Sequence, residues 1–490
     1  MLITLNYYKG VKIMESEFSN ICLKNFGILK NANINIAPLT VFTGANSSGK
    51  SFIAKLIHSF SSINEDDFHR DIDLSFSNTS KYFDEEHEKL FFKLTQEISQ
   101  HFKNNFNKNR KAFKIPIVLF NDLIEDGILK YFSIIFEERI MEEFGEDLDN
   151  LINFKEDFFE ITLNNCGFLK EKGESLDFYL NSIELANTMY ISQDNETILI
   201  ELKNDDEFIY LNVKPTKNNN TFNDFDSIFP IAYSTMAHSI LDNILLEKSY
   251  YVPAERSEII IDKKMLSRRV KNESDISKTQ SEVLYNLINI NADNKGDFYD
   301  LGCEFDKEFS GILVDVDEKG FINDITYNEI DSGNSISSKI LSTSIHEMTL
   351  FSLYLKYVLK KSDLLIIEEP EAHLHPKNQR MLVKYFILAI NMGLNILMTT
   401  HSDYIIEQLN NYIRLGNVKD EFYKNHDNYS KDQIIDFNKI KLYHFKQSDN
   451  HTFAPFEVPI NFTGFYDKNF NEVIDDLCDE TENIIDYKLR

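Results

Sequence analysis

The segment Gly44–Ser51 has the residue types and spacing that bind the phosphates of a nucleotide. It reads Gly-Ala-Asn-Ser-Ser-Gly-Lys-Ser and matches the pattern GxxxxGK[ST] in full. Its glycines allow a tight loop whose backbone N–H groups point at phosphate oxygens, and the positive end of the following helix dipole adds to the attraction. We expect Lys50 to reach the β- and γ-phosphates of ATP and Ser51 to ligate Mg²⁺. The residues of this loop expected to bind ATP are Gly44, Asn46, Ser47, Ser48, Gly49, Lys50 and Ser51.

A second motif ends an apolar run with two acids. The run Leu364–Ile367 favours a buried strand that delivers Glu368 and Glu369 to its carboxyl end. Ligands of open α/β sheets bind at that end. We expect Glu368 to hold Mg²⁺, directly or through water, and Glu369 to polarise the attacking water as the general base. The alternative is a strand that ends in solvated acids without a catalytic role.

A third motif, Thr400-His401-Ser402, follows a second apolar strand at Asn395–Thr399. A histidine at a strand end can donate a hydrogen bond to the γ-phosphate and sense its loss. We therefore expect His401 to join Glu369 as a catalytic residue. The alternative is a histidine with only a structural role.

These motifs require a strand, a loop and a helix in succession. The run Leu39–Phe42 is expected to be the strand before the phosphate loop, and Ser51–Phe60 to be the helix after it. The fold class is α/β: a P-loop ATPase head with a mixed sheet flanked by helices, plus a mainly helical insert with a small β portion. The expected divisions are a head in two parts, 14–60 and 335–490, and an insert at 61–340, helical at 61–158, β-rich at 159–213 and helical at 224–300, with a hairpin at 312–330.

Together the motifs resemble an ABC-type ATPase head on the OLD-, RecF- and SMC-like side of that superfamily, among the AAA family ATPases. Glu368–Pro376 resembles the extended Walker B and D-loop of the OLD- and RecF-like members, and His401 resembles their switch histidine. The other similar segments are Asn25-Phe26-Gly27 with Leu29, and Leu39–Gly44. The resemblance implies an ABC-type arrangement of sheet and helices, with ATP and Mg²⁺ as cofactors.

ABC-type heads also carry a signature loop that contacts the γ-phosphate of a partner subunit. The resemblance assigns this role to Leu341–Glu347, with Ser342 and Ser344 as ATP-binding residues. The segment departs from the family's LSGGQ pattern because both glycines are replaced, but a serine hydroxyl before a helix N-terminus can still bind phosphate. A working signature implies a homodimer of heads, or a higher oligomer, with ATP between the heads. The alternative is an ordinary Ser/Thr N-cap.

Two further features allow more than one interpretation. Arg256 could contact a phosphate or an interface, or could form a local ion pair with its neighbour Glu255. His373 and His375 look like a metal pair, but positions i and i+2 do not share a helical face, so a metal role is not favoured.

Composition limits the partners. The formal net charge is −28, with 79 acidic and 51 basic residues. An acidic surface repels phosphate backbones, so DNA is not favoured as a partner, although basic clusters occur at 103–114 and 263–271. The cysteines form no CxxC pair, which fits a reducing cytoplasm, and no apolar stretch is long enough for a membrane span. We expect a cytoplasmic protein with no membrane contact.

The use of ATP can be interpreted in three ways. The first is the ATPase subunit of a bacterial anti-phage defence system, similar to stand-alone ATPases of Septu- and PARIS-type systems, which controls a separately encoded effector such as a nuclease. OLD nucleases carry a Toprim domain after the head, and we see no matching acidic cluster after His401. The second is a RecF- or SMC-like DNA-binding ATPase of repair. The third is an ATP-bound scaffold with little turnover.

Overall fold

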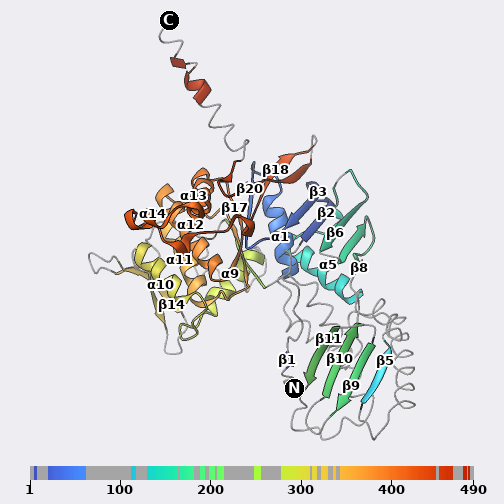
Figure 1. Cartoon of the computed structure of the whole chain (residues 1–490). Coiled ribbons are helices and arrows are strands. Elements are labelled where there is room, and N and C mark those ends of the chain that lie inside the picture. The colour runs from blue at the N-terminus through green and yellow to red at the C-terminus, as the bar shows by residue number, and fades with distance from the viewer. Residues whose placement is uncertain are drawn as a thin grey trace. The chain divides into compact units, whose positions relative to one another are not determined.

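The computed structural model divides the chain into two compact units (Figure 1). One contains Met1–Ser19, Ile63–Met141 and Asp147–Leu245, and the other contains Asn20–Ser62, Glu142–Glu146 and Leu246–Arg490. The residues that the structure describes are 5–7, 20–61, 112–116, 130–153, 155–163, 166–180, 188–193, 198–204, 207–213, 248–254, 256, 278–309, 312–316, 322–328, 335–337, 343–426, 428–448, 452–466, 478–482 and 484–485.

A mixed sheet forms the centre of the unit that holds the motifs. The strands of this sheet that belong to the unit are, in spatial order, β12 (Ser249–Val252), β16 (Leu364–Glu368), β17 (Asn395–Thr399), β4 (Leu39–Gly44), β18 (Ile440–Gln447), β19 (Phe453–Glu457), β3 (Leu29–Asn35) and β2 (Asn20–Phe26). The strands from β12 to β18 are parallel, whereas β19 is antiparallel to β18, and β2 to β3. β4 and β16 are buried at every position, which explains their unbroken apolar sequence, because helices cover both faces of a parallel sheet.

Helices flank this sheet. They are α1 (Lys50–Ser61), α9 (Lys278–Ile288), α10 (Tyr299–Phe309), α11 (Thr343–Tyr357), α12 (Pro376–Asn391), α13 (Asp403–Arg414) and α14 (Asp420–Asn425). α1 follows β4 directly, and α12 connects the neighbouring parallel strands β16 and β17. The mixed sheet with flanking helices confirms the α/β fold expected from the sequence.

Shorter elements complete this unit. A small antiparallel sheet consists of β13 (Ile312–Val316), β14 (Ile322–Asn328) and β15 (Ser335–Ser337). The hairpin expected at 312–330 is therefore present, although its turn lies outside the described residues. The remaining elements are the pair β20 (Ile460–Asn461) and β21 (Gly464–Phe465) and the short 3₁₀ turns Leu415–Asn417, Lys431–Gln433 and Phe437–Lys439.

The other unit contains most of the described strands of the expected insert. A five-stranded antiparallel sheet has the order β1 (Leu5–Tyr7), β11 (Glu207–Val213), β10 (Ile198–Asn204), β9 (Thr188–Gln193) and β5 (Ala112–Pro116). An antiparallel meander follows the order β6 (Phe158–Leu163), β7 (Cys166–Glu171) and β8 (Asp177–Leu180). Helix α5 (Lys130–Phe144), whose residues up to Met141 belong to this unit, and the 3₁₀ turn Leu148–Leu151 precede it. Most of the helical stretches expected at 61–158 and 224–300 lie outside the described residues.

Candidate ATP site

The three motifs follow three strands that lie side by side. β17 lies between β4 and β16, and all three strands are parallel. In register, Glu368 is paired with Thr399, and Thr399 with Phe42. The phosphate loop, the two acids and the histidine therefore emerge at the same carboxyl edge of the sheet, which is where such sheets bind ligands.

The loop between β4 and α1 needs its glycines. Gly44 has a φ of 133° and Gly49 a φ of 101°, which side-chain-bearing residues rarely adopt. A Cβ atom on Gly44 would also lie 2.6 Å from the carbonyl oxygen of Phe445. The loop therefore folds close against β18, and α1 begins directly after it, with the Ile53 amide donating to the Gly49 carbonyl at 3.1 Å.

Lys50 is buried at the start of α1. Its Nζ donates to the Gly44 carbonyl at 3.0 Å and to the Ala45 carbonyl at 2.8 Å. Burial lowers the pKa of Lys50, while the carboxylates of Glu369, Glu371 and Glu368 act in the opposite direction. The Lys50 ammonium thus lies inside the loop and is attracted by the acids at the end of β16. This position suits a group that binds phosphate.

Two buried oxygens at this edge are suited to bind a phosphate and a cation. Among the described residues, neither the Ser48 hydroxyl nor Oε1 of Glu368 has a hydrogen-bond partner. Glu368 is only 7% exposed, and such an unsatisfied carboxylate is costly without a cation. Ser51, in the first turn of α1, is exposed and can supply a hydroxyl ligand. These residues are therefore suited to hold Mg²⁺ and a phosphate chain.

Glu369 and His401 face each other in the solvent-accessible part of the site. The distance from His401 Nε2 to Glu369 Oε1 is 3.8 Å, and their side chains are 33% and 44% exposed. Burial lowers the pKa of His401, helped by Lys50 and opposed by Glu369. The imidazole therefore favours its neutral form, which keeps one N–H donor and leaves Glu369 free to accept a proton.

Glu369 itself has an unusual backbone. Its φ is 41°, in the left-handed region that costs energy for residues other than glycine. Its amide is held by the Thr399 carbonyl at 3.0 Å and by the Thr399 hydroxyl at 3.2 Å. Adjacent strands thus fix the turn that places this carboxylate.

Glu371 is a site residue to which the sequence analysis gave no role. Its Oε1 accepts from the His401 amide at 2.6 Å and from the Thr400 hydroxyl at 2.9 Å. Burial raises the pKa of Glu371, and these hydrogen bonds oppose that shift. The side chain therefore connects the turn after β16 to the turn after β17. The signal in the sequence was its place in Glu-Glu-Pro-Glu, directly after the two acids.

The signature segment is described only from Thr343 onwards, so Ser342 lies outside the described residues. The Ser344 hydroxyl donates to the His373 carbonyl at 2.8 Å, within the same chain. The His375 side chain accepts from the Lys377 amide at 3.3 Å and caps α12. No group of three or more metal-ligating side chains was found among the described residues.

Arg256 is buried beside α11 and the end of β16. It is 2% exposed, and its guanidinium forms an ion pair with Glu347 of α11 rather than facing solvent. It also donates to the carbonyl of Glu368 at 2.8 Å and to that of Glu369 at 3.3 Å. Arg256 is therefore held by a distant carboxylate and by backbone carbonyls. Its contact with a phosphate or an interface stays a prediction. Glu255 lies outside the described residues.

A family model supports the arrangement. The model described as AAA ATPase domain matches residues 17–406. The chain belongs to this AAA ATPase domain family. Membership implies nucleotide binding, and in this AAA ATPase the Gly44–Ser51 loop is the segment suited to it.

One curated relative is similar to this AAA ATPase at low sequence identity. Endonuclease GajA from Bacillus cereus (strain HuB5-5) is 24% identical over 414 residues, which are 79% of this chain and 54% of GajA. The chain thus spans about half the length of this curated relative.

Solved SMC heads give weaker likenesses. The SMC head domain from Thermotoga maritima is 11% identical, covers 91% of this chain and 100% of its own, and has a TM-score of 0.33. An SMC head bound to the C-winged helix domain of ScpA is 12% identical, covers 91% and 98%, and has a TM-score of 0.36. Likenesses at such scores carry no weight for function. No helix among the described residues is long and apolar enough to cross a membrane.

Proposed function

We propose that this AAA ATPase binds and hydrolyses ATP at the edge formed by β16, β17 and β4. The observation that supports the proposal is the convergence there of Lys50, Glu369 and His401. Glu369 lies 3.8 Å from His401, and the Glu369 carboxylate acts on the pKa of Lys50.

Each residue has a role in the proposed reaction. The backbone of Gly44–Ser51 and the Lys50 ammonium bind the phosphates. Ser51 and Glu368 would hold Mg²⁺, which neutralises charge on the β- and γ-phosphates. Glu369 accepts a proton from the attacking water, and His401 donates a hydrogen bond to the γ-phosphate. The buried Ser48 hydroxyl lies in the same loop and gains a partner when phosphate is present.

The proposal includes a homodimer of heads. Ser344 lies in the first turn of α11, at a helix N-terminus that can face the phosphate of a second head, and Ser342 precedes this helix in the sequence. ATP held between two heads would make hydrolysis depend on association.

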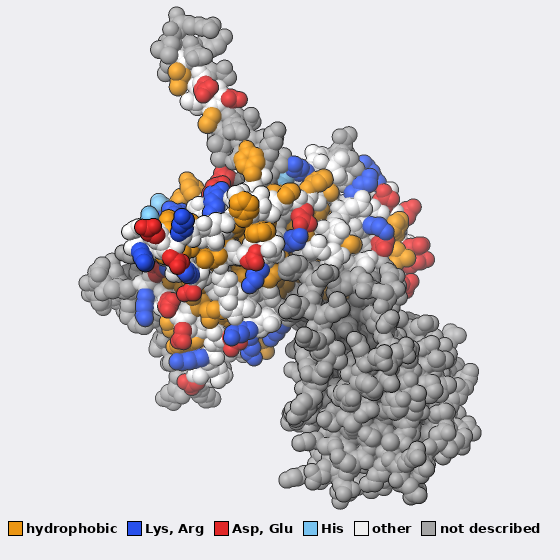
Figure 2. Space-filling model, in the orientation of Figure 1, with side chains coloured by type: hydrophobic (Ala, Val, Ile, Leu, Met, Phe, Trp, Pro, Cys, Tyr) orange, Lys and Arg blue, Asp and Glu red, His pale blue; other side chains and the backbone are white. Residues whose placement is uncertain are grey.

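The proposed biological role is anti-phage defence in the cytoplasm, with control of a separately encoded effector such as a nuclease. The likeness to a protein named Endonuclease GajA supports the association with a nuclease. A net charge of −28 favours protein partners over DNA. Figure 2 shows Lys, Arg, Asp and Glu side chains interspersed over the described part of one face.

The test is ATP turnover by the purified protein, with and without double-stranded DNA, beside Lys50→Ala and Glu369→Gln. We expect Mg²⁺-dependent turnover that both variants abolish and that DNA leaves unchanged. Strong stimulation by DNA would replace the defence role with DNA repair. Turnover equal to that of Lys50→Ala would refute hydrolysis and leave a scaffold that binds ATP.

A further inference from the structure

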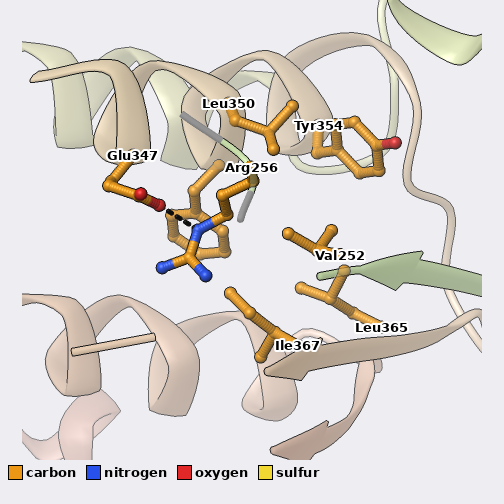
Figure 3. Close-up of a pocket in the computed structure, with 8 residues that line it drawn as sticks. Val252, Arg256, Glu347, Leu350, Tyr354, Leu365 and Ile367 are labelled. Carbon is orange, nitrogen blue, oxygen red and sulfur yellow. Dashed lines mark ion pairs between the residues drawn. The ribbon is translucent and has the colours of Figure 1, made fainter. Parts of the chain in front are cut away.

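A single buried guanidinium contacts the residues at the end of β16. Arg256 Nη1 donates to the carbonyls of Glu368 at 2.8 Å and Pro253 at 3.3 Å, and Nη2 donates to the carbonyl of Glu369 at 3.3 Å. Its Nε pairs with Glu347 (Figure 3). The Arg256 guanidinium thus binds the backbone carbonyls of Glu368 and Glu369 on one side and the carboxylate of Glu347 in α11 on the other.

The described side chains that line the cavity beside this ion pair include no second cation that could replace the Arg256 guanidinium. The side chains around the pair are largely apolar: Leu350, Tyr354, Val252, Leu365 and Ile367, which Figure 3 labels, and Phe351. They come from α11 and from the strands β12 and β16. The cavity beside them has a volume of about 10 Å³, on the order of the space that one water molecule needs. Without Arg256, the carbonyls of Glu368 and Glu369 would lose a charged donor that water could not fully replace.

The Arg256 contact falls on a strained residue. Glu369 adopts a φ of 41°, and its amide is held by Thr399 of β17. Arg256 holds its carbonyl from the opposite end of the residue. A strained conformation persists only where neighbours over-determine it, so removal of Arg256 allows the Glu369 backbone to relax and its carboxylate to shift.

The first turns of α11 reach the same segment by a second route. Ser344 donates to the carbonyl of His373, which also has a positive φ of 58°. Both ends of the segment from Glu368 to His373 are thus tied to the part of α11 that follows Ser342. A shift of α11 must therefore act on the position of Glu369.

We propose that Arg256 is a positioning residue that couples α11 to Glu369, the proposed general base, so that the position of α11 sets the position of the Glu369 carboxylate. This inference rests on the proposed ATPase function. It assigns to Arg256 an effect on kcat rather than on ATP affinity, because its guanidinium contacts Glu347 and the carbonyls of Glu368 and Glu369.

The experiment removes both charges together, because a single deletion would leave a buried ion unpaired. In Arg256→Met with Glu347→Leu, we expect kcat to fall about 10- to 100-fold while the Kd for a fluorescent ATP analogue stays within about threefold. Arg256→Lys serves as the second variant if the first does not fold. It keeps a charge for Glu347 but lacks the planar fork, so kcat should fall again.

The control is the other buried ion pair of α11. Lys356 Nζ lies 2.6 Å from Asp306 Oδ2, and both residues are buried. Asp306→Leu with Lys356→Met removes a similar pair from the same helix without touching β16. We expect this control to lower Tm but to keep kcat within about threefold. Equal losses of kcat in the two double variants would overturn the proposal, as would an unchanged kcat without Arg256.

A second readout does not need turnover. The amides of 368–372 should exchange hydrogen for deuterium faster in the Arg256 variants than in wild type, and should be unaffected in the control. If wild type shows no turnover above Lys50→Ala, the proposed ATPase function fails, and the exchange rates still decide whether Arg256 positions this segment. Unchanged exchange in every variant would refute the positioning role.

Discussion

At the scale of single residues, Glu371 connects the segment that carries Glu369, the proposed general base, to the turn that carries His401. Its Oε1 accepts from the His401 amide and the Thr400 hydroxyl. We expect Glu371→Ala to lower kcat about 10- to 100-fold with little change in ATP affinity, because the turn that carries His401 loses its acceptor. Steady-state turnover and nucleotide titration measure the two quantities separately.

The conservative variant Glu371→Gln provides the control for this effect. A glutamine keeps the volume and one acceptor oxygen, so kcat should return to within about fivefold of wild type. Equal losses in the alanine and glutamine variants would instead indicate that the negative charge of Glu371, and not its acceptor geometry, supports the site.

Glu143 makes stability depend on pH. Both of its carboxylate oxygens are buried without a hydrogen-bond partner among the described residues. Burial raises the pKa of Glu143 from 4.5 to about 7, with His58, Lys278 and Lys55 opposing and Glu282 reinforcing the shift. The folded state therefore binds a proton more tightly than the unfolded state does. The stabilisation is complete below pH 4.5 and is lost as pH rises to about 7.

Glu143→Gln should remove this loss because the amide cannot ionise. We expect the Tm of Glu143→Gln to exceed that of wild type by more at pH 8 than at pH 5. At pH 8 the variant's free energy of unfolding should be higher by roughly 3 kcal/mol. Glu146→Gln, at an exposed position of the same segment, is the control. A Tm difference that stays constant between pH 5 and pH 8 would rule out Glu143 as the titrating group.

At the scale of elements, the loop after β4 depends on two separate constraints at Gly44. Its φ of 133° disfavours any side chain, and an added Cβ would meet a backbone oxygen of Phe445 at 2.6 Å. We expect Gly44→Ala to weaken ATP binding strongly and to cost more than the roughly 1–3 kcal/mol of backbone strain alone. Thermal unfolding and nucleotide titration measure both effects.

Gly393→Ala is the control that introduces backbone strain without a steric clash. Gly393 has a φ of 106°, but an added Cβ would make only ordinary contacts, the nearest 3.7 Å from Lys361. This variant should lower Tm through strain and leave ATP affinity unchanged. A loss of affinity in Gly393→Ala equal to that in Gly44→Ala would mean that general destabilisation, not the loop, explains both.

The elements that carry the motifs could be predicted because their signals are local. The apolar run before Gly44 became β4, and the helix expected at Ser51–Phe60 became α1, Lys50–Ser61. The contact between Arg256 and Glu368 could not be predicted, since it spans 112 positions. The sequence offered the neighbour Glu255 as the ion-pair partner of Arg256, whereas the guanidinium pairs with Glu347 of α11. Patterns identify which residues lie at a strand end, but not which distant carbonyl a buried cation will hold.

At the scale of the whole molecule, the net charge and the proposed ATP contacts have opposite effects on the association of two copies. A net charge of −28 opposes the approach of two copies at low ionic strength. Association must therefore come from specific contacts, and ATP held between heads is the proposed one. It follows that association should strengthen with salt over the range in which screening dominates.

Dimer formation provides the last prediction. Glu369→Gln should bind ATP but not hydrolyse it, because the amide cannot accept the proton from water, so ATP-bound dimers should accumulate. Sedimentation velocity with ATP and Mg²⁺ should show a shift from monomer to dimer for Glu369→Gln, and none for Lys50→Ala, which lacks the ammonium that binds phosphate. In ADP both variants should remain monomeric. A Glu369→Gln protein that binds ATP and stays monomeric at every salt concentration would contradict a composite site and leave each head to act alone.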